Sequence, residues 1–211
     1  RGLNDKMILS FFKQACANYS RYGLTTLLTQ ANNQDMFLIP DPSALLTTLS
    51  DQTYIGAYVP HNLVLMSDIH RLKYAMYLNN DAYEALKKMI DAMPDEIAND
   101  FYVKEAYTSF TDLQYSNPNL AGKDERQLGN TVSIASKSIA YHEFETSALS
   151  QWLEAHSYEY GFILRYPKRM ASSTNHVYDA HYYRYVGKKN ANKIYKENSC
   201  IEEYNQKEAA E

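Results

Sequence analysis

A short apolar run, Y-G-F-I-L-R-Y-P at residues 160–167, constrains the fold of this chain more than any other stretch. Its Phe, Ile, Leu and Tyr residues, placed between a Gly and a Pro, are typical of a strand buried on both faces. A helix is predicted before the run, because apolar and aromatic residues recur there at three- and four-residue spacing: Leu149, Trp152, Leu153 and His156. A polar loop at 168–175 and a second aromatic strand between Val177 and Gly187 are predicted after it.

The composition is that of a chain able to bury a sizeable core. Its 211 residues fit one large domain, or one domain with an extension, and 45% of them are hydrophobic. A formal net charge of -4 does not favour a nucleic-acid partner. No apolar run approaches the ~18 residues that a membrane-spanning helix needs. Because the first residue is Arg1 rather than Met, the sequence leaves open whether a signal peptide or lipid anchor preceded it.

Tyrosine and cysteine carry two further indications. The chain has 20 Tyr against 7 Phe and 1 Trp. Such an excess indicates half-wet surfaces such as grooves or interfaces, although a compositional habit of the source genome explains it equally well. Cys16 and Cys200 lie far apart in sequence. They could form a disulfide, but two free buried thiols are the favoured interpretation.

The first 35 residues are predicted to form a helical extension. An apolar helical face runs from Met7 to Tyr19, and Arg21-Tyr22-Gly23 is interpreted as a stop with Gly as the C-cap. A second short piece covers 24–30. Such a face must be covered either by the domain itself or by a partner protein, and docking on a partner is slightly favoured.

Further elements are predicted along the chain between this extension and the apolar run. They are a strand at 36–39, an extended segment at 58–64, a helix at 80–93 capped by Asp81, a strand at 101–107, a helix opening at 108–114 and a loop at 115–124.

The order of these landmarks resembles that of the VanY-type D-alanyl-D-alanine carboxypeptidases, zinc peptidases that trim cell-wall stem peptides. Residues 58–64 resemble the family's Y-V-P-x-x-L-V, and 106–110 resemble its A-Y-R-S-Y. Residues 152–167 resemble its W-L…Y-G-F-I-L-R-Y-P, and 185–204 resemble its closing R-Y-V-G…E-E-Y. The resemblance covers roughly 36–205 and leaves 206–211 as a tail.

The resemblance implies an α+β fold, a small antiparallel sheet with helices packed around it. It also implies a last helix from about Asn190 that turns Ala191, Ile194 and Tyr195 inward.

The resemblance also implies where a zinc site would be. The family's S-x-H-x-x-G-x-A-x-D aligns with 124–133, and its E-x-W-H with 179–182. The three ligand positions then hold Arg126, Ser133 and Tyr182, and the position of the general base holds Asp179. Arg has no lone pair to donate, Ser is a weak neutral donor and a Tyr phenol keeps its proton near neutral pH. A catalytic zinc usually needs three good protein ligands and one open position, so no metal or other cofactor is expected.

Other parts of the family's site are changed as well. Asp179 is one methylene shorter than Glu, and Thr108 stands where the family has an arginine that resembles a clamp for the substrate carboxylate. The segment from Gln114 to Asp124 also looks shorter than in the family. The old cleft could still bind a ligand through residues at its rim: Tyr107, Thr108, Tyr178, His181, Tyr182 and Tyr183.

One cluster could have formed a replacement metal site. Asp179 and His181 share a face of the predicted strand, whereas His176 has the opposite parity. Two ligands are marginal for zinc, so a strand edge that contains histidines is the favoured interpretation. The other histidines match no ligand spacing, and neither a nucleophilic triad nor a Gly-rich phosphate loop is present.

These observations favour a catalytically inactive carboxypeptidase fold, acting as a structural or binding component of a bacterial cell envelope, in the periplasm or at the wall. The partners expected are peptidoglycan and a protein docked on the N-terminal helix. The alternative is an active D-alanyl-D-alanine carboxypeptidase with a rearranged metal site. If the zinc chemistry is lost, Arg126 should pair with Asp179 or another carboxylate, because an unpaired buried guanidinium costs several kcal/mol.

Overall fold

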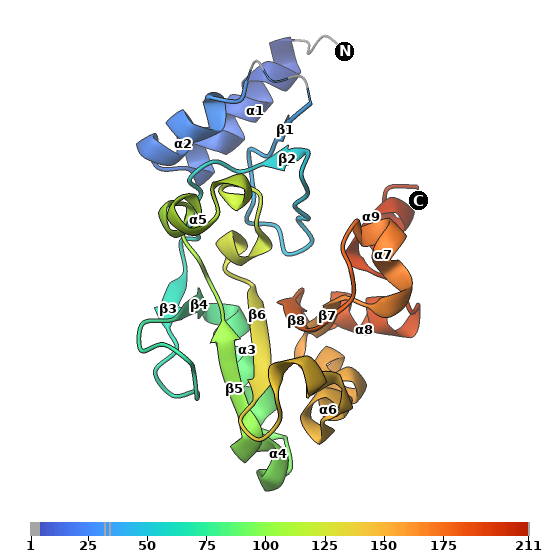
Figure 1. Ribbon diagram of the computed structural model, residues 1–211. Coiled ribbons are helices and arrows are strands. Elements are labelled where there is room, and N and C mark those ends of the chain that lie inside the picture. The colour runs from blue at the N-terminus through green and yellow to red at the C-terminus, as the bar shows by residue number, and fades with distance from the viewer. Residues whose placement is uncertain (1–4, 32, 34, 211) are drawn as a thin grey trace. The chain divides into compact units, whose positions relative to one another are not determined.

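The computed structural model describes residues 5–31, 33 and 35–210 of the chain (Figure 1). The predicted extension and tail are therefore described only from Asp5 and up to Ala210. The chain divides into two compact units, one made of residues 1–61 and 108–128, the other of 62–107 and 129–211. Each unit has its own cluster of buried hydrophobic residues.

A four-stranded antiparallel sheet organises the second unit. Its strands are β5 (Phe101–Glu105), β6 (Thr131–Ser136), β7 (Phe162–Tyr166) and β8 (Asp179–Tyr185), in the spatial order β5-β6-β8-β7 (Figure 1). Every residue of β6 is buried, as a central strand requires. The predicted α+β class with a small antiparallel sheet is confirmed. The run expected to be buried on both faces is β7, and it lies at the edge of the sheet.

A β-hairpin and two helices, at residues 63–100, also belong to the second unit. β3 (Leu63–Leu65) pairs antiparallel with β4 (Tyr77–Asn79), and α3 (Asn80–Asp91) follows at once. The N-cap of α3 is Asn79, whose side chain accepts a hydrogen bond from the Asp81 backbone N–H at 3.1 Å. The prediction of Asp81 as the cap was therefore wrong by two residues. The short helix α4 (Asp95–Asp100) begins after Pro94 and was not predicted.

The helix predicted before the apolar run is α6 (Ala148–His156), which buries Leu149 and Leu153. A 3-10 turn, η4 (Ser157–Tyr160), leads to Gly161 at φ 91°, where a side chain would be strained and would lie 2.8 Å from the Tyr185 ring. The opening glycine of the run is thus required by both conformation and space.

The segment 168–175 is more ordered than the predicted loop. It contains a 3-10 turn, η5 (Lys168–Met170), and a short helix, α7 (Ala171–Thr174), and ends at Asn175 in the left-handed conformation. A separate 3-10 segment, η3 (Tyr141–Thr146), precedes α6. Polar composition correctly indicated a break between strands but not that helical turns would fill it.

Two C-terminal helices, α8 (Lys188–Lys196) and α9 (Ile201–Glu208), follow the sheet. Ala191 and Ile194 are buried as expected. Tyr195, also expected to point inward, is 47% exposed, and its ring stacks on that of Tyr158 with centroids 3.7 Å apart. Tyr195 is exposed because it lies about 100° around the helix axis from the buried Ile194.

A buried ion pair joins β7 to α9. The Arg165 guanidinium is in a side chain only 1% exposed, and it donates two hydrogen bonds to the Glu202 carboxylate, at 2.6 and 3.1 Å. Paired in this bidentate way, a charge can lie in a run that is otherwise apolar.

The first unit consists mostly of helices. They are α1 (Asp5–Asn18), α2 (Arg21–Leu28) and α5 (Phe110–Ser116), with the 3-10 turns η1 (Pro118–Leu120) and η2 (Glu125–Leu128). β1 (Phe37–Leu38) and β2 (Thr53–Tyr54) form a short parallel pair. The core includes Ala15, Tyr19 and Leu27 from the N-terminal helices together with Ile55 and Leu113. The end of α1 and one face of α2 are therefore covered within this unit.

Two expectations about the N-terminal helices are corrected. Ser20 caps α2 by accepting a hydrogen bond from the Gly23 N–H at 3.1 Å, so the chain begins a helix where a stop was predicted. Gly23 is needed for packing, because a Cβ there would lie 2.9 Å from the Ala57 carbonyl oxygen. Cys16 and Cys200 are free, but only Cys200 is buried. Burial raises the pKa of the Cys200 thiol.

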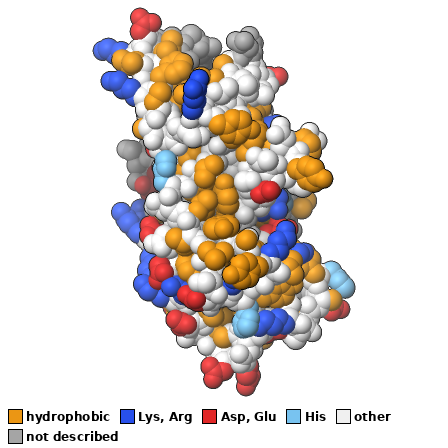
Figure 2. Space-filling model, turned by 90° about the vertical axis from the view of Figure 1, so that its left-hand side faces the viewer, with side chains coloured by type: hydrophobic (Ala, Val, Ile, Leu, Met, Phe, Trp, Pro, Cys, Tyr) orange, Lys and Arg blue, Asp and Glu red, His pale blue; other side chains and the backbone are white. Residues whose placement is uncertain are grey.

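The distribution of charged side chains on the surface agrees with the modest net charge. Lys and Arg side chains are interspersed with Asp and Glu side chains and with hydrophobic ones on the face shown in Figure 2. Within the described residues, no helix has both the length and the apolar character that crossing a membrane requires.

We expect Glu202→Gln to lower the free energy of unfolding by about 3 kcal/mol, because it removes the Glu202 negative charge from the buried Arg165 guanidinium. The matched control is Glu208→Gln, which breaks the exposed pair with Lys193 and should change stability far less. Urea unfolding of both variants measures the difference. Equal effects of the two substitutions would show that the buried pair does not hold β7 to α9.

Candidate functional site

Two of the three positions where the family motifs place zinc ligands are direct neighbours in the sheet. Ser133 of β6 lies opposite Tyr182 of β8 in the register, and Glu105 of β5 lies opposite Ser133 on its other side. Side chains of directly paired residues point to the same face of a sheet, so the three form one row. Ser133 is buried, at 2% exposure, and the Tyr182 ring lies against that of Tyr166, with centroids 5.8 Å apart. This row contains a single carboxylate beside two neutral hydroxyl groups.

At the position where the family motif has its general base, the Asp179 carboxylate binds the backbone of its own strand. Asp179 is the first residue of β8, and its carboxylate accepts a hydrogen bond from the His181 backbone N–H at 2.9 Å. Across the sheet Asp179 is paired with Tyr166. A carboxylate held in this way serves the strand's geometry.

His181 is buried, at 7% exposure, and both of its ring nitrogens face backbone carbonyls. Nδ1 lies 2.7 Å from the Ile134 oxygen and Nε2 lies 2.9 Å from the Tyr141 oxygen. The imidazole is stacked on the Tyr141 ring, with centroids 3.6 Å apart, and on the Phe144 ring at 4.3 Å. In this setting neither nitrogen offers a lone pair to a cavity where a metal ion could sit.

Tyr141 is a neighbour of these residues that the sequence did not single out. Lys104 Nζ lies 3.2 Å from the centroid of its ring, which also stacks on His181. Burial raises the pKa of the Tyr141 phenol, the nearby Ser133 hydroxyl opposes this, and the negative charges of Asp179 and Glu105 add to the rise. The only signal in the sequence was the aromatic pair of Tyr141 and Phe144 in η3, which matches no part of the quoted motifs.

The alternative cluster does not come together as a metal site. The His176 ring stacks on Tyr166, with centroids 3.9 Å apart, and its Nδ1 lies 2.8 Å from the Val177 carbonyl oxygen. Across residues 5–31, 33 and 35–210, no three His, Cys, Asp or Glu side chains are grouped so as to hold a metal ion. The donor set of the described residues therefore does not fit the zinc that the family motifs imply.

The proposed rim residues lie in different environments. Tyr183 is fully buried in the core of the second unit, so it cannot rim an open cleft, and that prediction is corrected. Its inward direction follows from the alternation of side chains along β8. Tyr178 lines a cavity, and burial together with the nearby Glu145 and Glu154 charges raises the pKa of its phenol to about 12. Tyr107 donates its backbone N–H to the Tyr77 carbonyl at 3.1 Å, and Thr108 begins the other unit's second segment.

Arg126 lies in η2 of the first unit and has a carboxylate partner, as predicted. Its guanidinium donates to Asp124 at 2.6 and 3.0 Å, and its backbone N–H donates to the same carboxylate at 2.8 Å. Both side chains of this pair are largely buried. The first ligand position is thus held by a cation that a neighbouring carboxylate neutralises.

Gln127, the next residue, is a positioning residue that sequence reasoning missed. Its buried side-chain amide donates to the carbonyls of Gly56 at 2.7 Å and Tyr58 at 3.0 Å, and its oxygen accepts from the Gly122 N–H at 3.1 Å. These three bonds tie the Y-V-P segment to the segment that carries Arg126. The family motif offers no reason to expect a buried Gln there.

Comparison with known proteins agrees with this fold. The VanY D-alanyl-D-alanine carboxypeptidase family profile matches residues 111–188. A D-alanyl-D-alanine carboxypeptidase of Enterococcus faecalis strain V583 is 33% identical over 192 residues, which cover 86% of this chain and 70% of that protein. The chain therefore belongs to the VanY-type D-alanyl-D-alanine carboxypeptidase family.

Solved structures with a similar fold include LdcB and VanYB. The LdcB LD-carboxypeptidase, in a structure described as revealing the basis of peptidoglycan recognition, superposes with a TM-score of 0.73 at 26% identity, over 82% of this chain and 91% of that one. VanYB in complex with D-alanine-D-alanine has a TM-score of 0.58 at 24% identity, over 77% of this chain and 97% of that one, which shows a likeness of fold alone.

Proposed function

We propose that this chain is a catalytically inactive member of its family that serves as a binding or structural component of a bacterial cell envelope. The observation that carries the proposal is the chemistry of the three former ligand positions. Arg126 is a permanent cation, and Ser133 and Tyr182 carry hydroxyl groups that stay protonated near neutral pH. A catalytic zinc usually requires three good ligands, and none of these three is one.

The contacts around these positions support the same proposal. The two groups nearest to a ligand or base, His181 and Asp179, are engaged with backbone atoms. A metal ion would have to displace those hydrogen bonds within a buried region, where an unmade hydrogen bond costs about 1–3 kcal/mol.

Family membership supports the kind of ligand and the location. The Enterococcus faecalis relative is named for cleaving D-alanyl-D-alanine, and the LdcB structure concerns peptidoglycan recognition. We infer that this chain keeps the ability to bind a peptidoglycan stem peptide without hydrolysing it, and that it works outside the cytoplasmic membrane. Binding without chemistry needs only complementary surface, which the loss of zinc ligands does not remove.

The direct test combines elemental analysis with a product assay. After dialysis against zinc, the purified chain should hold far less than one zinc per molecule. It should also release D-alanine from a peptide ending in D-alanyl-D-alanine no faster than a sample without protein does. The Enterococcus faecalis relative serves as the active control. About one zinc per chain together with zinc-dependent release of D-alanine would overturn the proposal.

A variant that restores the family's donors is the matched comparison. It combines Arg126→His, Ser133→Asp, Asp179→Glu and Tyr182→His. If the donor set is what this chain lacks, the variant should bind more zinc than the natural chain in the same dialysis. Equal zinc content in both would mean that features other than these donors decide metal binding.

We also propose that the exposed N-terminal half of α1 docks on a partner protein. Met7, Ile8, Leu9 and Phe12 are 40–56% exposed, whereas Ala15, nearer the other end of the helix, is buried in its own unit. These side chains gather in the first turns of the helix, and a cluster of exposed apolar side chains is typical of an interaction surface.

Replacing Met7 and Leu9 together by Lys tests this docking without touching the core. The variant should keep the unfolding midpoint of the natural chain, because both side chains are exposed, and it should be lost from complexes that co-purify with the natural chain. A fall in the midpoint, or a complex that survives the double substitution, would contradict the proposed docking.

A further inference from the structure

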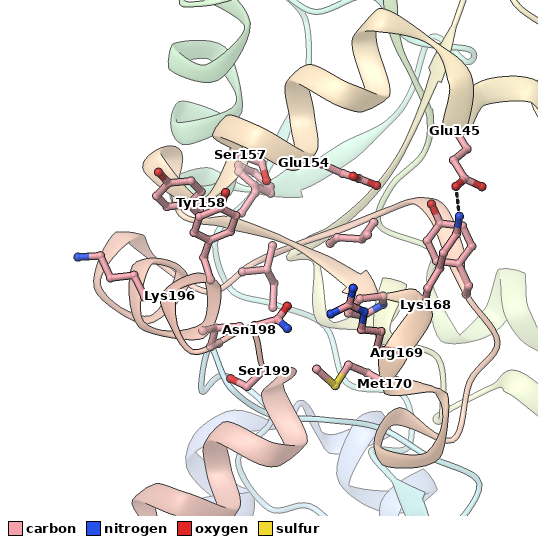
Figure 3. Close-up of a pocket in the computed structure, with 17 residues that line it drawn as sticks. Glu145, Glu154, Ser157, Tyr158, Lys168, Arg169, Met170, Lys196, Asn198 and Ser199 are labelled. Atoms are coloured by element: carbon pink, nitrogen blue, oxygen red, sulfur yellow. Dashed lines mark hydrogen bonds and ion pairs between the residues drawn. The ribbon is translucent and has the colours of Figure 1, made fainter.

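A cavity of about 610 Å³ lies in the second unit, beside the edge strand β7 (Figure 3). Its apolar lining comes mainly from Ile163 and Leu164 of β7, Pro167, Met170 and Ile194. The stacked rings of Tyr158 and Tyr195 also line it. The volume falls within the range of small-molecule sites. None of the former ligand positions Arg126, Ser133 and Tyr182 lines it.

Three charged residues of the lining, Glu154, Arg169 and Lys196, have no ion pair within the described residues, and the Lys196 ammonium group points away from the cavity in Figure 3. Lys168 and Glu145 neutralise each other in an ion pair, drawn as the dashed line in Figure 3. Glu154 of α6 and Arg169 of η5 lie on different sides of the cavity in the same view, and within the described residues neither has an ion pair. The cavity therefore presents one carboxylate and one guanidinium to whatever enters it.

Uncharged polar groups accompany these charges. The Asn198 amide points toward the Arg169 side chain in Figure 3. Tyr178 and Ser199 also line the cavity, and in the described part of the chain their buried hydroxyl groups have no hydrogen-bond partner.

We propose that this cavity binds a short peptide with free termini, its carboxylate at Arg169 and its ammonium group at Glu154. A guanidinium fork matches a carboxylate, and a carboxylate matches an ammonium group. The apolar lining accepts small aliphatic side chains, and Asn198 offers a donor and an acceptor to a peptide bond. The site is separate from the former zinc positions and does not depend on the proposed loss of catalysis.

The test is an NMR titration of the full chain with trialanine, in its all-L and all-D forms. We expect saturable shifts of backbone amides at Ile163, Arg169 and Asn198 with at least one of the two. The form that saturates identifies the source, because an all-D peptide points to cell-wall material and an all-L peptide to protein. If neither form produces a saturable shift, the proposal is wrong.

Blocked peptides and charge variants assign the two ends of the ligand. Amidation of the peptide's C-terminus should weaken its binding to the natural chain about tenfold. Arg169→Gln should weaken binding of the free peptide by a similar factor. The amidated peptide should then bind the Arg169→Gln variant no more weakly than either change alone predicts, because both remove the same contact. Acetylation of the N-terminus and Glu154→Gln should behave as a second such pair. Lys189→Gln, an exposed substitution on α8 outside the lining, is the matched control and should leave affinity unchanged. Fully additive losses, or an equal loss in the control, would overturn the assignment.

Discussion

The ion pair between Arg165 and Glu202 is the interaction on which the second unit depends most. Arg165 lies inside the apolar run of β7, and a guanidinium at 1% exposure is tolerable only with a partner that satisfies its charge and geometry. Glu202 supplies both from α9, with two hydrogen bonds. The edge strand and the C-terminal helices are thereby held together, and they form much of the lining of the cavity beside β7.

The positions where the family motifs place zinc ligands are ordinary parts of a hydrogen-bonded fold. Ser133 and Tyr182 are cross-strand neighbours, Asp179 accepts from the backbone of its own strand, and His181 is packed between Tyr141 and Phe144. In the other unit Arg126 is neutralised by Asp124. Each substitution is accommodated by local contacts, which is how a protein can keep a fold after its chemistry is gone, as we propose for this chain.

Hydrophobic periodicity and the family motifs predicted the α+β class, the helix α6 and the strands β5, β7 and β8 of the main sheet, because these signals repeat over many residues. Single-residue assignments were less secure. Gly23 was expected to end a helix, yet it lies within one because Ser20 caps the chain anew. Tyr183 was expected at a rim and is buried, because strand parity is set by pairing with neighbours that a motif does not reveal. Gln127 and Tyr141 act through contacts distant in sequence, which no local pattern indicates.

The most direct test of the central claim is the free energy of unfolding measured with a chelator and then with increasing free zinc. A ligand that binds only the folded state stabilises it, by about 2.7 kcal/mol at a concentration one hundred times its dissociation constant. Because the former ligand positions hold Arg126, Ser133 and Tyr182, we predict the same unfolding free energy in chelator and in zinc. A stability that rises steadily with the logarithm of the zinc concentration would contradict this account.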